Sequence, residues 1–240
     1  MRSFTVRFFV SSLFLLLLSG PSLANQLEPF KATYTARFNG ISVTATRKLT
    51  GQDDNWRLDF DTNTLFAHIN EYSRFTRRDD QIIPYHYEYR RTGLGRDRGT
   101  ILNFEPSKGM VLNVSNPERD LKGVSPHILD KVSYQLQLAL DIAAGKETLQ
   151  YEIADGKKVR KYTFAREGTE TLVTPLGEIE VIKVRRVRNA DSARETTVWF
   201  APRWNYALVK LVQREENGKR YQISLTKLSI DGKKVTASQN

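Results

Sequence analysis

Histidines and carboxylates are the residues of this sequence whose chemistry would be catalytic. The three histidines are far apart in the chain, and no two have the close spacing that presents a pair of imidazoles to one metal ion; they are His68, His86 and His127. No Gly-x-Ser-x-Gly segment marks a serine nucleophile. The lack of cysteine removes a thiol nucleophile, thiolate zinc ligands and disulfides. We therefore predict no catalytic residue, no metal and no cofactor.

Asp59 and Asp61 are two residues apart in a predicted strand, so they share one face. A carboxylate pair of this kind suits the general acid and general base of a hydrolase. The same spacing is expected on the solvent side of an amphipathic strand, where Arg57 would accompany the two acids. The second interpretation is the prediction, and the hydrolase remains an alternative.

Residues 85–98 combine a row of aromatic side chains with the densest basic stretch of the chain. The glycines of this stretch match no phosphate-binding loop, because no helix follows them. The tyrosines would form the apolar wall of a groove, and the arginines its basic rim. The competing interpretations are the core face of a strand and a solubilising surface. The candidate binding residues are Tyr85, Tyr87, Tyr89, Arg90, Arg91, Arg96 and Arg98. A second basic stretch contains Lys183, Arg185, Arg186 and Arg188.

The N-terminus predicts export. Arg2 and Arg7 precede an apolar run over 8–18 that is too short to span a bilayer as a helix, and small residues end at Ala24. We predict a signal peptide over 1–24, cleaved after Ala24, and a location in a bacterial periplasm. Removing it takes the net charge from +10 to +8 and leaves 216 residues without a further apolar stretch of transmembrane length.

The elements that would position these side chains are mainly strands. Apolar and polar residues alternate from residue 30 onward, and the Asn39-Gly40 pair predicts a tight hairpin. Later strands are expected near 100–105, 158–166, 170–174, 195–200 and 220–230, among others. Apolar residues at helical spacing over 126–144 predict one helix that begins at Ser125-Pro126. The predicted fold class is mainly β: a curved or partly closed, barrel-like antiparallel sheet with one substantial α-helix. Without a linker or repeat, residues 25–240 are expected to form a single domain.

Several segments in a fixed order carry a likeness to a known family. They are YTARFNGI (34–41), YSRF (72–75), IPY (83–85), DKVSYQLQL (130–138), TPLG (174–177) and VWFAP (198–202). With them the chain resembles the bacterial family known as domain of unknown function 3108. It departs from the family at Leu208, where a proline is usual, a difference that bears on an edge or bulge of one strand. The resemblance implies an exported envelope protein with an antiparallel β architecture and implies no known activity.

The function expected from these features is non-enzymatic binding or envelope maintenance. An apolar groove with a basic rim would take an anionic lipid or glycan, an arrangement that is loosely similar to periplasmic lipoprotein carriers. The alternative is a protein–protein scaffold or accessory factor for envelope assembly without a ligand pocket. Export makes nucleic acid an unsuitable partner despite the basic charge.

Overall fold

A computed structural model of the protein describes residues 27–38, 41–64, 67–188 and 192–236. The predicted signal peptide, its cleavage point after Ala24 and the Asn39-Gly40 turn lie outside these residues. The described residues form a fifteen-stranded sheet and one α-helix, α1 (Ser133–Ala143). The strands are β1 (Phe30–Phe38), β2 (Ile41–Gln52), β3 (Asn55–Asn63), β4 (Ala67–Arg78), β5 (Gln81–Gly93), β6 (Arg98–Glu105), β7 (Met110–Asn113), β8 (Leu121–Lys122), β9 (Leu149–Ala154), β10 (Val159–Thr174), β11 (Gly177–Val187), β12 (Glu195–Ala201), β13 (Ala207–Arg214), β14 (Arg220–Ile230) and β15 (Lys233–Lys234). Three 3-10 turns complete the elements: η2 (Pro106–Lys108), η3 (Pro117–Arg119) and η4 (Pro202–Trp204).

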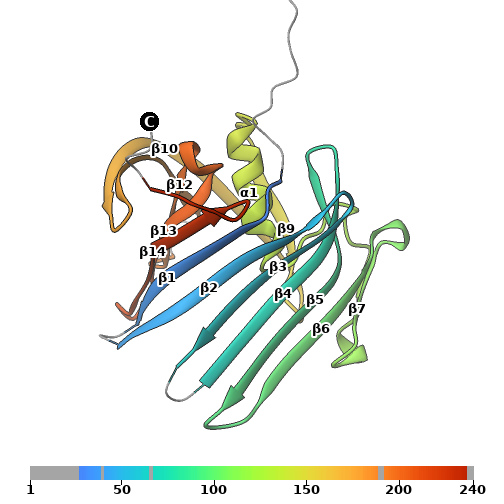
Figure 1. Ribbon diagram of the computed structural model, residues 1–240. Coiled ribbons are helices and arrows are strands. Elements are labelled where there is room, and N and C mark those ends of the chain that lie inside the picture. The colour runs from blue at the N-terminus through green and yellow to red at the C-terminus, as the bar shows by residue number, and fades with distance from the viewer. Residues whose placement is uncertain (1–26, 39–40, 65–66, 189–191, 237–240) are drawn as a thin grey trace, which may run out of the picture.

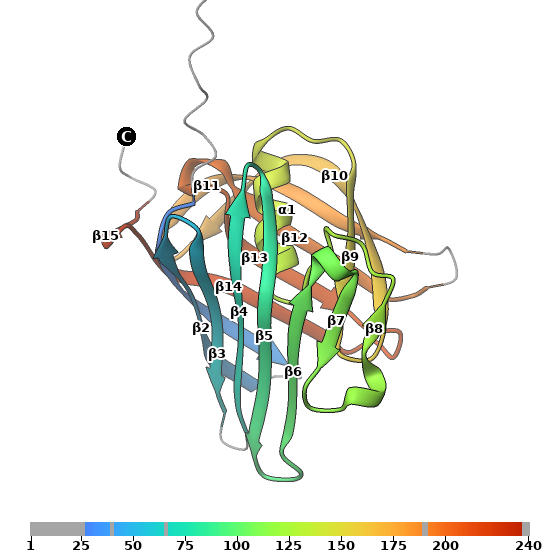
Figure 2. The same ribbon diagram turned by 90° about the vertical axis from the view of Figure 1, so that its right-hand side faces the viewer.

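The sheet is antiparallel throughout, in the order β8-β7-β6-β5-β4-β3-β2-β1-β14-β13-β12-β11-β10-β9, with β15 paired to β14. Neighbours in sequence pair with each other except for β8 and β9, which are the two ends of the sheet, and β1 pairs with β14 and so joins the first and last long strands. The sheet curves around α1, which lies on its concave side (Figures 1 and 2). The predicted fold class, a curved and partly closed antiparallel sheet with one helix, is confirmed.

The two ends of the sheet approach each other without a strand ladder between them. The Asn113 side chain of β7 donates a hydrogen bond to the Gly156 carbonyl in the β9–β10 turn at 2.9 Å. Leu129, on the segment that leads into α1, pairs as a single parallel bridge with Ile153 of β9. This segment therefore covers the free edge of β9, which would otherwise expose unpaired backbone groups.

The helix begins later than the sequence pattern predicts. Residues 125–132 form turns, and α1 starts at Ser133 rather than at Ser125-Pro126. The reason is a reciprocal cap at Asp130. Its Oδ1 accepts hydrogen bonds from the backbone N–H groups of Val132 and Ser133, both at 2.8 Å, while Ser133 Oγ accepts from the Asp130 N–H at 3.0 Å. This pattern satisfies the first free donors of a helix.

Asp130 should make stability depend on pH. It is fully buried, and burial raises its pKa to about 6, although hydrogen bonds from Ser73 and the helix start oppose this shift. Because the folded state holds the proton more tightly than the unfolded chain, this group stabilises the fold increasingly as the pH falls from 7 to 5. Relative to Asp130→Asn, the wild-type protein should gain about 1 kcal/mol in unfolding free energy over this range. Urea titrations of both proteins at pH 7 and 5 measure the difference, and parallel pH profiles would contradict it.

Gln137 and Asp141 of α1 are buried, although the helical pattern places them away from the apolar stripe. Gln137 accepts a hydrogen bond from the Ile82 N–H at 2.7 Å and donates to the Asp80 carbonyl at 2.8 Å. Asp141 accepts from the Tyr151 hydroxyl at 2.9 Å. These contacts hold the helix to the β4–β5 turn on one side and to β9 on the other. Helix α1 is thus fastened inside the sheet by satisfied polar groups as well as by apolar packing.

One long strand replaces two shorter strands predicted over 158–166 and 170–174. The register between β10 and β11 shifts between Arg166 and Gly168, so Glu167 is an extra residue in the ladder. Gly168 has φ +109°, a conformation that glycine adopts without steric cost. The strand therefore continues through a bulge where the sequence suggests a break. Within the described residues, no helix has both the length and the apolar character needed to cross a bilayer.

Candidate functional site

The predicted tyrosine row is divided by a β-bulge in β5. The β4–β5 register shifts so that Phe75 pairs with Pro84 and Arg74 with His86, which leaves Tyr85 as the extra residue. Tyr87 is fully buried, whereas Tyr85 is 38% exposed and donates a hydrogen bond to Asn55 Oδ1 at 3.0 Å. The prediction that three tyrosines share one face is therefore wrong for Tyr85. Pro84 is the signal for the irregularity, since a proline inside a strand is typical of bulges.

Tyr87 and Tyr89 point toward Lys131, two residues before α1, whose Nζ lies 4.8 Å from the Tyr89 ring centroid. The Tyr87 hydroxyl donates to Glu71. The four arginines of the predicted rim lie in the last part of β5, in the β5–β6 loop and at the first residue of β6. Their side chains are exposed, apart from the half-buried Arg91. The structure thus keeps these arginines together, but it does not place them on either of the two cavities described below.

The carboxylates Asp59 and Asp61 lie on the outer face of β3, and a basic side chain accompanies each of them. Arg57 donates to both carboxylate oxygens of Asp59, at 2.8 and 2.6 Å, and His68 Nε2 lies 2.6 Å from Asp61 Oδ2. The neighbouring residues Trp56, Leu58 and Thr62 are buried on the opposite face. The paired acids are therefore directed away from the interior of the sheet.

The histidines lie in separate places, as their spacing predicts. His86 is on the outer face, within 3.1 Å of the Tyr72 hydroxyl and 2.9 Å of Asn103 Oδ1, while His127 is exposed in the turn before α1. Throughout the described part of the chain, no three histidine, aspartate or glutamate side chains gather as metal ligands would.

A cavity of about 200 Å³ lies between α1 and the concave side of the sheet. Most of its wall consists of apolar side chains from four strands and of Val132, which directly precedes α1, and a few polar groups complete it. The lining residues are Tyr34, Arg47, Phe60, Glu71, Val132, Gln135, Leu208, Leu211 and Ile223. The Glu71 carboxylate is already engaged, because Lys131 Nζ lies 3.4 Å away and the Tyr87 hydroxyl donates to it.

Arg47 is the unusual residue of this cavity. It is only 7% exposed, and its Nη2 atom is buried without a hydrogen-bond partner among the described residues. The groups that act on its charge are the phenols of Tyr34 and Tyr134 rather than carboxylates. Burial raises the pKa of both tyrosines to about 12, so they are neutral at pH 7 and supply no counter-charge. A buried guanidinium without an anion is costly, and burial lowers the pKa of Arg47.

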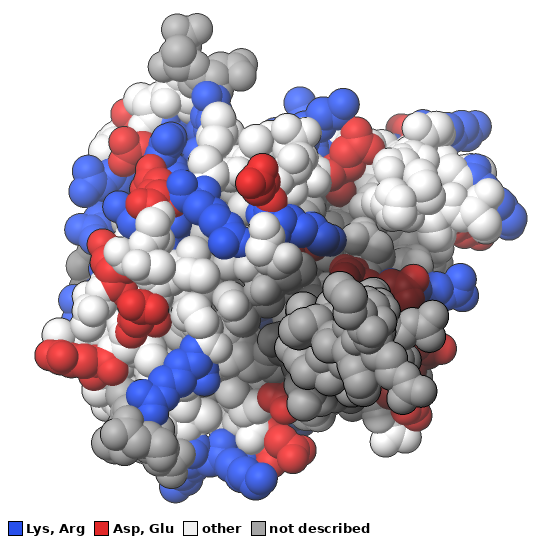
Figure 3. All heavy atoms as spheres, turned by 90° about the horizontal axis from the view of Figure 1, so that it is seen from above, with Lys and Arg blue, Asp and Glu red and all other residues white. Residues whose placement is uncertain are grey.

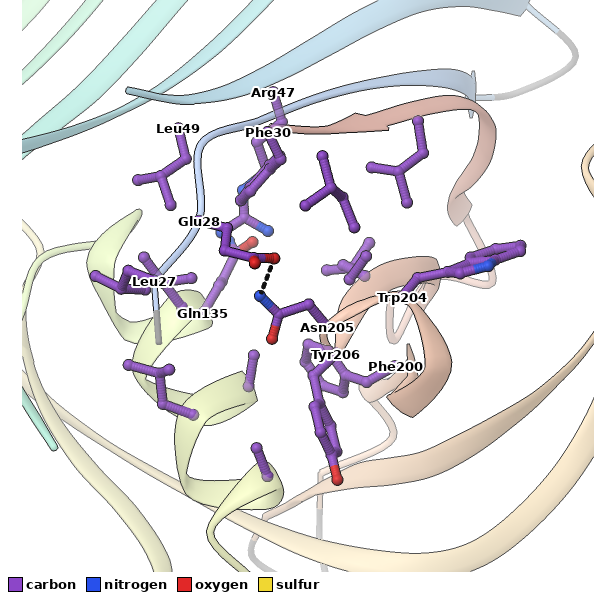
Figure 4. A pocket seen from close by; sticks show the side chains of 18 residues that line it. Leu27, Glu28, Phe30, Arg47, Leu49, Gln135, Phe200, Trp204, Asn205 and Tyr206 are labelled. Atoms are coloured by element: carbon purple, nitrogen blue, oxygen red, sulfur yellow. Dashed lines mark hydrogen bonds between the residues drawn. The ribbon is translucent and has the colours of Figure 1, made fainter. Parts of the chain in front are cut away.

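A second, smaller cavity of about 50 Å³ adjoins the first and shares Arg47, Gln135 and Leu208 with it. Its lining is largely apolar and includes the C-terminal half of α1. Glu28 accepts a hydrogen bond from Asn205 Nδ2 at 3.1 Å, and this bond spans the pocket between the chain before β1 and the turn after η4 (Figure 4). Arg47 therefore contributes to both cavities.

A signal in the sequence predicts that Arg47 faces inward. Alternation in β2 places Ala45, Arg47 and Leu49 on one face, and both apolar neighbours are at most 1% exposed. Because Ala45 belongs to the apolar face of the strand, the next residue on that face, Arg47, is a cation among core residues. On the face of the molecule shown in Figure 3, lysines and arginines are interspersed with acidic residues rather than gathered into one basic patch.

Leu208 also belongs to this site. The β12–β13 register shifts between Trp199 and Phe200, which makes Val209 the extra residue beside Leu208. The Leu208 carbonyl accepts a hydrogen bond from the Tyr34 hydroxyl at 3.0 Å. The departure from the family pattern at Leu208 thus falls next to a bulge and on the cavity wall.

Comparison with solved structures supports the fold. The crystal structure of a β-barrel-like protein of domain of unknown function DUF1849 from Brucella abortus matches with a TM-score of 0.58 at 12% identity, over 86% of this chain and 99% of that chain. A candidate lipoprotein from Parabacteroides distasonis gives a TM-score of 0.35 at 10% identity, over 85% and 97%. A candidate outer-membrane lipoprotein-sorting domain from Vibrio parahaemolyticus gives 0.25 at 11%, over 86% and 87%. Superpositions as loose as the last two establish no shared fold. The protein is thus of the barrel-like, open-sheet class.

Residues 33–226 match the family model described as "Protein of unknown function (DUF3108)". The chain belongs to this family, which confirms the resemblance drawn from its sequence segments. No curated protein matches the chain.

Proposed function

We propose that this protein is a non-enzymatic binding protein of the bacterial periplasm that holds an anionic amphiphile in its interior cavity. The observation that carries the proposal is the buried Arg47 guanidinium, which lines an apolar cavity and has an unpaired donor. An anionic headgroup would neutralise this charge, and its tail would occupy the apolar space. The N-terminal sequence pattern supports the periplasmic location.

The size and lining of the cavity favour one kind of amphiphile. At about 200 Å³, the cavity is smaller than the ~300–1,000 Å³ of typical drug-sized sites, so it suits a single short acyl chain better than a lipid with several chains. A glycan is disfavoured, because its hydroxyls would lose their partners against Phe60, Leu211 and Ile223. Arg47 replaces the predicted arginines of the β5–β6 loop as the anchor for the anion.

A binding assay with three ten-carbon probes tests this function. Decanoate should displace a fluorescent reporter from the wild-type protein, and Arg47→Met should weaken decanoate binding about 100-fold because a buried ion pair is lost. Decanol, which has no charge, should bind both proteins equally. Lys48→Met is the matched control, since Lys48 is adjacent in β2 but exposed. Decyltrimethylammonium should not bind the wild-type protein.

Two results would overturn the proposal. One is equal binding of decanoate to the wild-type and Arg47→Met proteins. The other is a solvent extract of protein purified from its native host that is free of amphiphile by mass spectrometry, together with a stable protein partner on gentle isolation. The second result would favour the scaffold alternative.

A further inference from the structure

A second group of arginines lies at the N-terminal side of α1, away from the residues that line the two cavities. Arg186 and Arg188 belong to β11 and its end, and Arg194 directly precedes β12. We refer to these three residues as the inner arginine cluster. Arg186 and Arg188 continue the face of β11 that carries the fully buried Val184, and Arg186 pairs in register with the buried Phe164. The cluster is thus on the inner side of the sheet.

The basic residues on the two faces of β11 have different contacts. On the outer face, Lys183 Nζ lies 3.4 Å from Glu167, and Arg185 donates to the same carboxylate. On the inner face, Arg186 stacks on the Tyr162 ring with Cζ 3.3 Å from the centroid, and Arg188 donates to Thr196 Oγ1 at 3.1 Å. Neither contact supplies a negative charge. The two outer cations of β11 therefore share one carboxylate, whereas Arg186 and Arg188 form no ion pair with a carboxylate of the described residues.

The three inner guanidinium groups have unused donors. The Nε atoms of Arg186, Arg188 and Arg194 are each buried and have no hydrogen-bond partner among the described residues. Burial lowers the pKa of Arg186 and Arg188, and repulsion from the neighbouring arginines lowers it further. Buried donors and unrelieved repulsion are both costly unless an anion completes the arrangement.

The charge balance indicates which anion fits. Glu215 pairs with Arg194 at 3.1 Å and is the carboxylate of the described residues that joins the cluster, so the net charge of this group is +2. A carboxylate ligand would leave one charge uncompensated. A phosphate monoester carries about −1.5 to −2 at pH 7 and offers three strong acceptor oxygens. Planar guanidinium forks match these oxygens in pairs.

We propose that Arg186, Arg188 and Arg194 form a binding site for a phosphate group. Tyr162 holds the Arg186 plane by stacking, and Thr196 orients Arg188, so two of the three cations are positioned before the ligand arrives. Tyr134 of α1 is next to the site, with its ring centroid 5.3 Å from that of Tyr162, and its phenol is affected by both Arg186 and Arg47. The phosphate site and the amphiphile cavity therefore flank the same tyrosine.

Titration with inorganic phosphate at constant ionic strength, followed by ³¹P NMR and by the unfolding temperature, tests the site. Wild-type protein should bind phosphate and become more heat-stable with it. The double variant Arg186→Gln/Arg188→Gln should bind at least tenfold more weakly while remaining folded, because the substitutions remove repulsion. Arg185→Gln, which removes one positive charge from the outer face, should bind like the wild type. No saturable binding, or an equal loss in Arg185→Gln, would overturn the proposal.

Octyl phosphate distinguishes a lipid headgroup from a free phosphate. If the phosphate belongs to an amphiphile, octyl phosphate should bind more tightly than inorganic phosphate, and Arg47→Met should leave inorganic phosphate binding unchanged. If the natural ligand is free phosphate, the octyl chain should add no affinity. Both results support the site. Since decanoate binding tests Arg47 and inorganic phosphate tests the cluster, either proposal can fail without the other.

Discussion

Replacing Arg47 by methionine is expected to stabilise the ligand-free protein by about 1–3 kcal/mol. The substitution removes a buried cation with an unpaired donor and leaves an unbranched apolar side chain of similar reach in an apolar setting. It should orphan no other group, because the Tyr34 hydroxyl keeps its hydrogen bond to the Leu208 carbonyl at 3.0 Å. Urea unfolding at pH 7 without added ligand measures the effect.

This outcome would separate two roles of a buried charge. A residue that serves only the fold should destabilise the protein when it is replaced, whereas a residue kept for a ligand should weaken binding and strengthen the empty fold. Lys48→Met provides the comparison, with an expected change within about 0.5 kcal/mol for an exposed side chain. A loss of stability in Arg47→Met would show that the guanidinium is already compensated within the folded chain, and it would contradict our account of the cavity.

Gly51→Ala should destabilise the protein by about 3 kcal/mol or more. Gly51 has φ +142°, a backbone conformation that other residues rarely adopt. A methyl group there would overlap the Asn55 carbonyl oxygen and lie 2.8 Å from the Trp56 Cα, both of which are backbone atoms of the paired strand β3. Relief would require the β2–β3 hairpin to separate beside the buried Trp56 ring. Thermal and urea unfolding report the loss.

Gly218→Ala is the matched control for backbone strain. Gly218 has φ +78°, yet a Cβ atom there would have no neighbour within 4 Å. Its cost should be limited to the left-handed conformation, about 1–2 kcal/mol. Equal effects of the two substitutions would mean that the close approach of Asn55 and Trp56 to Gly51 does not matter.

Local patterns were sufficient to predict much of the architecture. Strands expected near 100–105, 195–200 and 220–230 correspond to β6, β12 and β14 within two residues at each end. The reason is that alternation and turn residues act over a few positions and do not depend on distant contacts. The helix was expected from its apolar spacing, but its start depends on the Asp130–Ser133 cap, which an equally plausible Ser125-Pro126 signal obscured.

The candidate site was less predictable, because it depends on strand phase and on distant partners. One extra residue in β5 turns Tyr85 out of the row that alternation predicts. The cavity wall joins residues that are far apart in sequence, such as Tyr34 and Leu208, which are 174 positions apart. A pattern within one strand identifies its two faces, but it does not say which face the curved sheet encloses.

The sequence by itself therefore determined the strands and the antiparallel class of this protein, since these follow from local alternation and turn chemistry. Its family followed from the resemblance of several ordered segments. Only the tertiary structure decided which charges are buried. The curvature of the sheet around α1 buries Arg47 and the Nε atoms of the inner arginine cluster, while it leaves Lys48 and Arg185 exposed. Neighbouring cations on one strand thus differ in free energy, because a charge on the inner side of the sheet loses its hydration and a charge on the outer side keeps it.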